Sequence, residues 1–323
     1  MEPCPVFSLR NGVEIPAVGF GTGIAKGLLK HPRAAFSRLI KEPIRYLLSA
    51  EYRANYYKYP LLKDMKKDMT LKRVSRKAYN EGYRLFDTAR AYAYSEQYLG
   101  EALFSGPNPV ERNRVFLISK VTNSAQRAHT VREDFELTLK NLRTDYLDLL
   151  LMHWPQPGEY LNTWKLMEEL YLSGRVRAIG VCNCHIHHLE EIERVASVQP
   201  MANEIECHPL FQQRRDREYC KERGIQLIAY TPVGRMNREL LKNPFLNRLR
   251  DKYRLESITQ VILRWHYQLH DISIPNTTNV KHMKSNFNIW NFSLTDEEME
   301  EMRSLDAGRK VWPDSDNCDF TKL

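Results

Sequence analysis

The run LDLLLM, residues 147 to 152, is the most informative short stretch for the fold. A strand with one solvated face alternates apolar and polar residues, whereas this run ends in four consecutive apolar side chains. Strands with both faces buried are typical of parallel sheets that helices cover on the outside. The run therefore predicts a strand of a parallel sheet.

Similar short apolar runs lie before and after this one. They are AVGF (17–20), RLFD (84–87), VFLIS (115–119), RAIGV (177–181), ANEI (202–205), QLIAY (226–230) and DISI (271–274). Helical patterns lie between them, and no Gly/Ser linker divides the chain, so we predict a single (β/α)8 TIM barrel domain over residues 1–323, of the α/β class. A doubly wound sheet is the alternative, but the GFGTG of residues 19–23 does not have the G-x-G-x-x-G spacing typical of that fold.

Several helix ends can be predicted from single residues. Thr130 is expected to be the N-cap of the helix that follows it, and Thr295 with Glu298 has the spacing of a capping box. Gly174 and Gly224 stand where glycines follow helix C-termini. These ends support the alternation of strands and helices.

The composition excludes several classes of protein. Hydrophobic residues make up 42% of the 323 residues, which is enough for a large core. No apolar run approaches the ~20 residues of a membrane span, the N-terminus has no signal-peptide pattern, and six cysteines in this length do not form a disulfide scaffold. We therefore expect a cytoplasmic protein without a transmembrane segment, either a monomer or a small homo-oligomer.

Chemically capable residues follow the predicted strands. Asp87 ends the second strand with Tyr92 shortly after it, Lys120 follows the third, and His153 follows the fourth. Each residue alone has an ordinary structural explanation, such as a cap, a solvated turn or a buried histidine. In a barrel, however, all strand C-termini meet at one face, which is where active sites lie.

These four side chains together suit proton transfer to a carbonyl oxygen. A phenol has a pKa of ~10, and a neighbouring ammonium is expected to lower it toward neutral pH. Asp87 would hold Lys120 charged, and His153 could hydrogen-bond the substrate oxygen. Tyr92 is thus predicted to be the general acid.

The sequence resembles the aldo-keto reductases in most of its length. The similar motifs are GVEIPAVGFGTG, GYRLFDTARAYAYSEQYLGEAL, VFLISK, YLDLLLMHWPQP, GRVRAIGVCN, NEIECHP, AYTPVG and QVILRW. The resemblance implies a (β/α)8 barrel, reduction of an aldehyde or ketone with NADPH or NADH, and a catalytic tetrad of Asp87, Tyr92, Lys120 and His153. It further implies a set of cofactor-binding residues: Gly21, Thr22, Asn183, Glu204, Tyr230, Thr231, Val233, Asn276, Thr277, His282 and Asn286.

Some of these positions depart from the family pattern. Asn276 and His282 stand where the family has a lysine and an arginine for the 2′-phosphate of NADPH, so NADH becomes a serious candidate. Thr277, Lys281 and Lys284 could compensate in part. Glu204 replaces a glutamine that contacts the nicotinamide carboxamide, and a carboxylate can accept from its NH2 but cannot donate to its oxygen unless protonated.

An insertion over residues 24–70 distinguishes this chain from the family. It holds eleven Lys/Arg against four Asp/Glu and is rich in tyrosine. We predict a lid-like helical segment on the catalytic face, which either packs with its charges solvated or selects an anionic or sugar-like carbonyl substrate. A binding or regulatory protein that uses this basic surface on a reductase scaffold is the alternative function, and nucleic-acid binding is not expected.

The stretch CNCHIHH, residues 182 to 188, crowds potential metal ligands together. Its spacing matches no structural zinc pattern, and the segment already serves as a strand end and helix start. No metal site is expected there.

Overall fold

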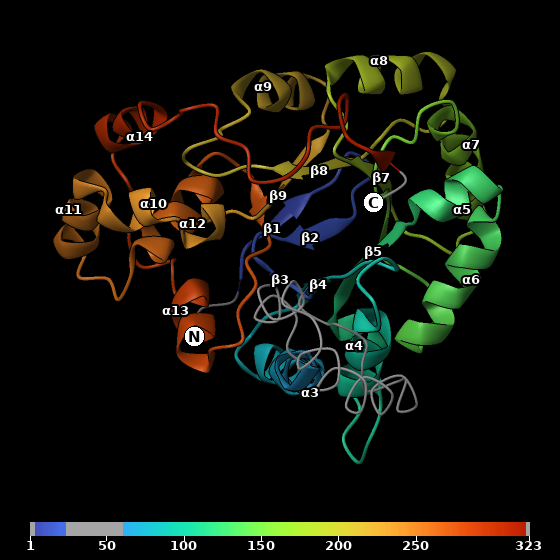
Figure 1. Ribbon diagram of the computed structural model, residues 1–323, viewed down its shortest axis with the longest axis horizontal. Coiled ribbons are helices and arrows are strands. Elements are labelled where there is room, and N and C mark those ends of the chain that lie inside the picture. Colours follow the sequence, from blue (N-terminus) through green and yellow to red (C-terminus); the bar gives the residue numbers. More distant parts are fainter. Residues whose placement is uncertain (1–3, 24–60, 321–323) are drawn as a thin grey trace, which may run out of the picture.

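The apolar runs form the strands of a parallel barrel in the computed structural model, which describes residues 4–23 and 61–320 (Figure 1). Consecutive strands are hydrogen-bonded neighbours from β3 to β10, and a bridge between Val18 and Ser273 joins the two ends. The barrel strands are β3 (Gly19–Gly21), β4 (Leu85–Asp87), β5 (Phe116–Val121), β6 (Leu149–Met152), β7 (Ile179–Cys182), β8 (Ala202–Glu206), β9 (Gln226–Tyr230) and β10 (Ile272–Ser273). The predicted (β/α)8 barrel is confirmed.

Helices surround the barrel and follow its strands (Figure 1). They are α3 (Leu61–Asn80), α4 (Ser95–Phe104), α5 (Asn123–Ala128), α6 (Val131–Leu142), α7 (Tyr160–Leu172), α8 (Ile186–Val195), α9 (Arg214–Glu222), α10 (Arg238–Lys242), α11 (Pro244–Lys252), α12 (Ile258–Gln268), α13 (Val280–Phe287) and α14 (Asp296–Arg303), with short 3-10 turns at Arg112–Arg114 and Gly234–Met236. None of the helices described is long and apolar enough to cross a membrane.

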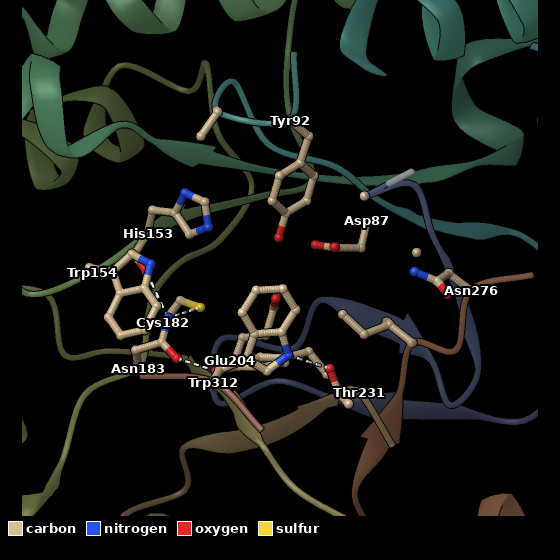
Figure 2. Close-up of a pocket in the computed structure, with 15 residues that line it drawn as sticks. Asp87, Tyr92, His153, Trp154, Cys182, Asn183, Glu204, Thr231, Asn276 and Trp312 are labelled. Atoms are coloured by element: carbon tan, nitrogen blue, oxygen red, sulfur yellow. Dashed lines mark hydrogen bonds between the residues drawn. The ribbon is translucent and has the colours of Figure 1, made fainter. Parts of the chain in front are cut away.

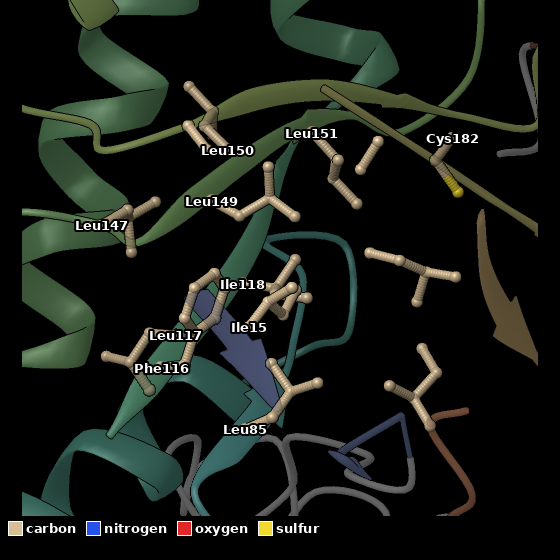
Figure 3. Packing of buried hydrophobic residues seen from close by; sticks show 14 of the residues in the cluster. Ile15, Leu85, Phe116, Leu117, Ile118, Leu147, Leu149, Leu150, Leu151 and Cys182 are labelled. Atoms are coloured by element: carbon tan, nitrogen blue, oxygen red, sulfur yellow. The ribbon is translucent and has the colours of Figure 1, made fainter. Parts of the chain in front are cut away.

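An antiparallel hairpin precedes the barrel and contributes to its core. β1 (Val6–Ser8) pairs with β2 (Glu14–Pro16), which leads directly into β3. Ile15 of the hairpin is fully buried and packs among barrel side chains that include Leu85 and Ile118 (Figure 3). The hairpin therefore adds apolar contacts at the end of the barrel where the strands begin.

Two glycines permit close approaches that any side chain would obstruct. A Cβ at Gly180 of β7 would lie 2.5 Å from the carbonyl oxygen of Ala202 on β8. A Cβ at Gly100 of α4 would lie 2.6 Å from the carbonyl oxygen of Asn141 on α6. Both contacts involve backbone atoms, which cannot move aside easily, so glycine is required at each position.

Three of the four predicted helix ends are confirmed, whereas most strand ends differ from the predicted runs by one or two residues. Gly174 and Gly224 have positive φ just after α7 and α9, and the capping box of Thr295 and Glu298 is present. Thr130 does precede α6, but its side chain makes no capping hydrogen bond, so that part of the prediction is wrong. The last strand has two residues instead of four, because only Ile272 and Ser273 pair in register with β9.

The predicted insertion falls mostly outside the described residues. Its last part, residues 61–70, belongs to α3, which therefore begins earlier than expected. Residues 24–60, on which the lid hypothesis depends, are not among those described.

Candidate active site

The barrel brings the four predicted catalytic residues together at the ends of neighbouring strands. Asp87 is the last residue of β4, Tyr92 lies in the loop after it, Lys120 lies near the end of β5, and His153 directly follows β6. Asp87, Tyr92 and His153 line one cavity of about 260 Å³, and Figure 2 shows them around it. Parallel strands ending at one face account for this convergence of residues from distant parts of the sequence.

Lys120 is buried and held by three acceptors. Its Nζ forms an ion pair with Asp87, donates to the carbonyl oxygen of Thr88 at 3.1 Å, and lies 3.2 Å from Oε1 of Glu204. Burial lowers the pKa of Lys120, but the two carboxylates outweigh burial and hold the pKa well above its usual value. The lysine is therefore charged, as predicted.

The phenol of Tyr92 departs from the expected electrostatics. Lys120 Nζ lies 5.3 Å from the centre of the Tyr92 ring and lowers the pKa of the phenol, as predicted. Burial nevertheless raises the pKa of Tyr92 by more, so the expected net lowering is wrong. The phenol thus remains protonated at neutral pH, which is the form that a proton donor needs.

His153 is neutral in this environment. Burial, and then the charge of Lys120, lower the pKa of His153 to about 3. Its ring meets the Tyr92 ring edge-on, with 5.5 Å between the ring centres, and its backbone N–H donates to the carbonyl oxygen of Val121 at 3.2 Å. A neutral imidazole beside a phenol can hydrogen-bond an uncharged carbonyl oxygen.

A hydrogen-bonded chain fixes the side of the cavity opposite Tyr92. Asn183 has a left-handed backbone (φ 60°) directly after β7. Its Nδ2 donates to the carbonyl oxygen of His153 at 3.0 Å, and its Oδ1 accepts from the Tyr230 hydroxyl at 2.7 Å. The ring of Tyr230 is thereby held in one orientation at the cavity wall.

Glu204 is the most unusual residue of the site. It is 1% exposed, and none of the described residues donates a hydrogen bond to its Oε2. Burial and the charge of Asp87 raise the pKa of Glu204 to about 8, while Lys120 lowers it. At neutral pH the Glu204 carboxyl therefore tends to keep its proton and shares a hydrogen bond with Asp87, and on ionising it becomes a buried acceptor that needs a donor.

The other predicted cofactor residues divide into two groups. Gly21, Thr231 and Asn276 line the same cavity as Asn183, Glu204 and Tyr230. The remaining residues lie around it: Thr22 is buried, Val233 packs against the core, Thr277 follows β10, and His282 and Asn286 are on α13. The latter group could contact only a ligand that extends beyond the cavity toward α13.

The cavity has features that suit a nicotinamide dinucleotide. Glu204 lies at its wall, and Gly21 lines it without a side chain, since a Cβ there would lie only 3.0 Å from the carbonyl oxygen of Ile274. A Cβ at Gly23 would contact the Tyr92 ring at 3.6 Å. The residues present therefore fit the cofactor.

Two tryptophans that the sequence analysis did not predict as site residues line the cavity. Trp154 follows His153. Trp312 reaches the cavity from the C-terminal segment, residues 304–320, which follows α14 (Figure 2). Glu206 accepts hydrogen bonds from the backbone N–H groups of Val311 (2.6 Å) and Trp312 (3.0 Å), and Trp312 Nε1 donates to Thr231 Oγ1 at 2.9 Å. No local sequence pattern could have placed residue 312 there.

The histidines of residues 182 to 188 face two aspartates of the C-terminal segment. His185 Nε2 lies 3.2 Å from Asp314, and His187 Nε2 lies 3.3 Å from Asp316. His188 Nδ1 accepts the backbone N–H of His185, and burial lowers the pKa of His188 to about 4. Its Nε2 lies 3.7 Å from Oδ1 of Asp316. These contacts attach the C-terminal segment to the start of α8.

Comparison with known proteins identifies the family. Residues 63–307 match the model of the Aldo/keto reductase family. The chain belongs to this family. It is 39% identical to the glyoxal reductase of Bacillus subtilis over 75% of this chain and 86% of the relative, and 37% identical to the methylglyoxal reductase DkgA of Salmonella typhimurium over 74% and 86%.

Solved structures extend the similarity of this reductase to nearly the whole chain. An aldo-keto reductase from a deep-sea metagenome library superposes with a TM-score of 0.80 at 29% identity, covering 98% of this chain and all of the other. A Bombyx mori aldo-keto reductase in complex with NADP gives a TM-score of 0.75 at 25% identity, covering 98% and 97%. The protein is therefore an NAD(P)H-dependent oxidoreductase that reduces aldehydes or ketones.

Proposed function

We propose that the reductase acts on a small uncharged carbonyl compound, such as an α-oxoaldehyde, with Tyr92 as the proton donor. The main support is the wall of the cavity: among the described residues that line it, His153 is neutral and no lysine or arginine is present. Trp154 and Trp312 make that wall aromatic. The names of the glyoxal and methylglyoxal reductases agree with this substrate class.

The geometry of the tetrad supports a role for each of its residues. The bound cofactor supplies a hydride to the carbonyl carbon. As the carbonyl π electrons move to the oxygen, Tyr92 transfers its proton there, and the product is an alcohol. His153 hydrogen-bonds the same oxygen and orients it, while Lys120, fixed by Asp87, stabilises the phenolate that Tyr92 leaves behind.

A preference for anionic or sugar-like substrates stays a prediction about the insertion. The cations that would bind such a substrate, for example Arg38, Lys41 and Arg45, lie outside the described residues. The cytoplasmic location and the monomeric or small oligomeric state likewise stay predictions.

Turnover assays test the proposed function. Purified protein is supplied with NADPH or NADH and with methylglyoxal, a neutral aromatic aldehyde, or an acidic carbonyl compound, and oxidation of the cofactor is followed by absorbance. We expect the uncharged substrates to be reduced with the higher kcat/KM. A clear preference for the acidic compound would contradict the proposal and implicate the basic insertion.

A further inference from the structure

One cation is shared by two buried carboxylates beneath the cavity. Lys120 is ion-paired with Asp87 and lies 3.2 Å from Glu204, and the three side chains are 0%, 4% and 1% exposed. One positive charge cannot balance two negative charges. The group therefore has an excess negative charge whenever both carboxylates are ionised, and little water is present to screen it.

Glu204 lies at the cavity wall, and when it is protonated it shares a hydrogen bond with Asp87. It lines the cavity between Asn183 and Thr231, as Figure 2 shows, and none of the described residues donates a hydrogen bond to its Oε2. Once Glu204 ionises it can no longer donate to Asp87, and a donor bound in the cavity, such as the carboxamide NH2 of a nicotinamide, can then satisfy its carboxylate.

We propose that Glu204 makes the reductase bind the oxidised, positively charged form of its cofactor in preference to the reduced, neutral form. The inference rests on the proposed function, in which the nicotinamide occupies this cavity. Both forms carry the carboxamide, but only the oxidised ring carries a positive charge that the excess negative charge attracts. Glutamine at this position would provide the hydrogen bond without the charge.

The preference should depend on pH through Glu204. The titratable and charged groups that face it are Asp87 of β4, Tyr92 of the following loop, Lys120 of β5, Cys182 of β7 and Tyr230 of β9. Burial raises the pKa of the thiol and of both phenols, so these stay neutral to high pH. The hydrogen bond between the two carboxyls raises the pKa of Glu204 and lowers that of Asp87, so Glu204 keeps its proton to higher pH than Asp87 does. With a pKa of about 8, Glu204 becomes charged just above neutral pH.

Equilibrium binding tests the proposal without turnover. The dissociation constants of the oxidised and the reduced cofactor are measured by quenching of tryptophan fluorescence, between about pH 6 and about pH 10. Both forms of the cofactor carry the same phosphates, so titration of the phosphates changes both dissociation constants equally and does not change their ratio. The proteins are the natural enzyme, Glu204→Gln, and Glu301→Gln, which removes a charge from the exposed pair with Arg248 on α14.

We expect the preference of the natural enzyme for the oxidised form to rise about tenfold across this range, or about 30 mV for a two-electron couple. It should stay constant in Glu204→Gln and rise in Glu301→Gln. A ratio that does not change with pH in the natural enzyme, or that changes equally in Glu204→Gln, overturns the inference and leaves the proposed function intact. Failure to bind either form overturns both.

Thermal unfolding without cofactor gives a second measurement. The folded protein binds the Glu204 proton more tightly than the unfolded chain, whose glutamate has a pKa of 4.5. Stability should therefore fall as pH rises from 4.5 to about 8, and Glu204→Gln should lack this contribution. The variant is expected to gain stability relative to the natural enzyme at alkaline pH, and parallel curves would overturn the inference.

Discussion

Two buried carboxylates at opposite ends of the barrel differ in how completely hydrogen bonds and opposite charges pair them. Asp148 directly precedes β6, at the end where the strands begin, and is 1% exposed. Its Oδ2 accepts from Arg112 at 2.7 Å and from the backbone N–H of Leu117 at 2.9 Å, and its Oδ1 accepts from Arg177 at 2.7 Å. Glu204 is equally buried, but it shares one lysine with Asp87 and has an oxygen to which none of the described residues donates.

The difference separates residues that stabilise the fold from residues that serve chemistry. A fully paired carboxylate contributes to stability, because its buried oxygens all accept hydrogen bonds, here from the partly exposed Arg112, the half-exposed Arg177 and a backbone N–H group. An incompletely paired carboxylate costs stability, and such costs are typical of functional sites. In barrels, chemistry lies where the strands end and stability is concentrated where they begin.

The largest expected effect is at the chemical end. Tyr92→Phe removes only the proton that Tyr92 is proposed to transfer, so kcat should fall by about 10²- to 10⁴-fold. Cofactor dissociation constants and the melting temperature should change little, because the ring still packs beside His153. Steady-state kinetics and fluorescence titration measure both quantities. A variant that retains most of its activity would show that another group donates the proton.

The opposite pattern is expected for Asp148→Asn. The substitution weakens the charge-assisted hydrogen bonds from Arg112 and Arg177, which water can partly replace because Arg177 is 48% exposed, so the free energy of unfolding should fall by about 2 kcal/mol. Because the site lies at the other end of the barrel, kcat of the folded enzyme should be nearly unchanged. Urea unfolding and kinetics well below the transition test this. Glu301→Gln, at an exposed pair, should lose less than about 1 kcal/mol and is the control. Equal losses in Asp148→Asn and Glu301→Gln would mean that the buried, fully paired Asp148 stabilises the fold no more than an exposed ion pair does.

Sequence patterns predicted the barrel, and the meeting of the four candidate catalytic residues at one face of it, because both depend on where short apolar runs lie in the chain. Each strand is a continuous apolar run, and Asp87, Lys120 and His153 stand at fixed places relative to such runs. The pKa of Tyr92 could not be predicted, since it depends on how much of the phenol the folded chain buries. Trp312 could not be predicted either. It reaches the cavity because Glu206, more than a hundred residues earlier in the chain, binds its backbone.

Cofactor preference should be weak, since the phosphate-binding end of the site has few fixed charges. Asn276 and His282 are exposed and carry no permanent charge, and Lys284 lies 3.7 Å from Glu81. The kcat/KM ratio of NADPH to NADH should therefore stay below about a thousandfold, or ~4 kcal/mol. Asn276→Lys should raise the ratio by about tenfold, because it adds one charge-assisted contact. A natural ratio above that limit would mean that other residues hold the phosphate.

The smallest effect is expected where the C-terminal segment closes the cavity. Thr231→Val keeps the side-chain shape but removes the acceptor for Trp312 Nε1. The indole is 43% exposed, so water can replace the lost acceptor, and the net cost should be about 0.5–1 kcal/mol. Because Glu206 still holds the backbone of residues 311 and 312, the segment should stay in place. KM for an aromatic aldehyde should thus rise about two- to fivefold with kcat unchanged. A fall in kcat with no change in KM would contradict this expectation. It would mean that Thr231→Val had disturbed Glu204 and not the position of the Trp312 ring.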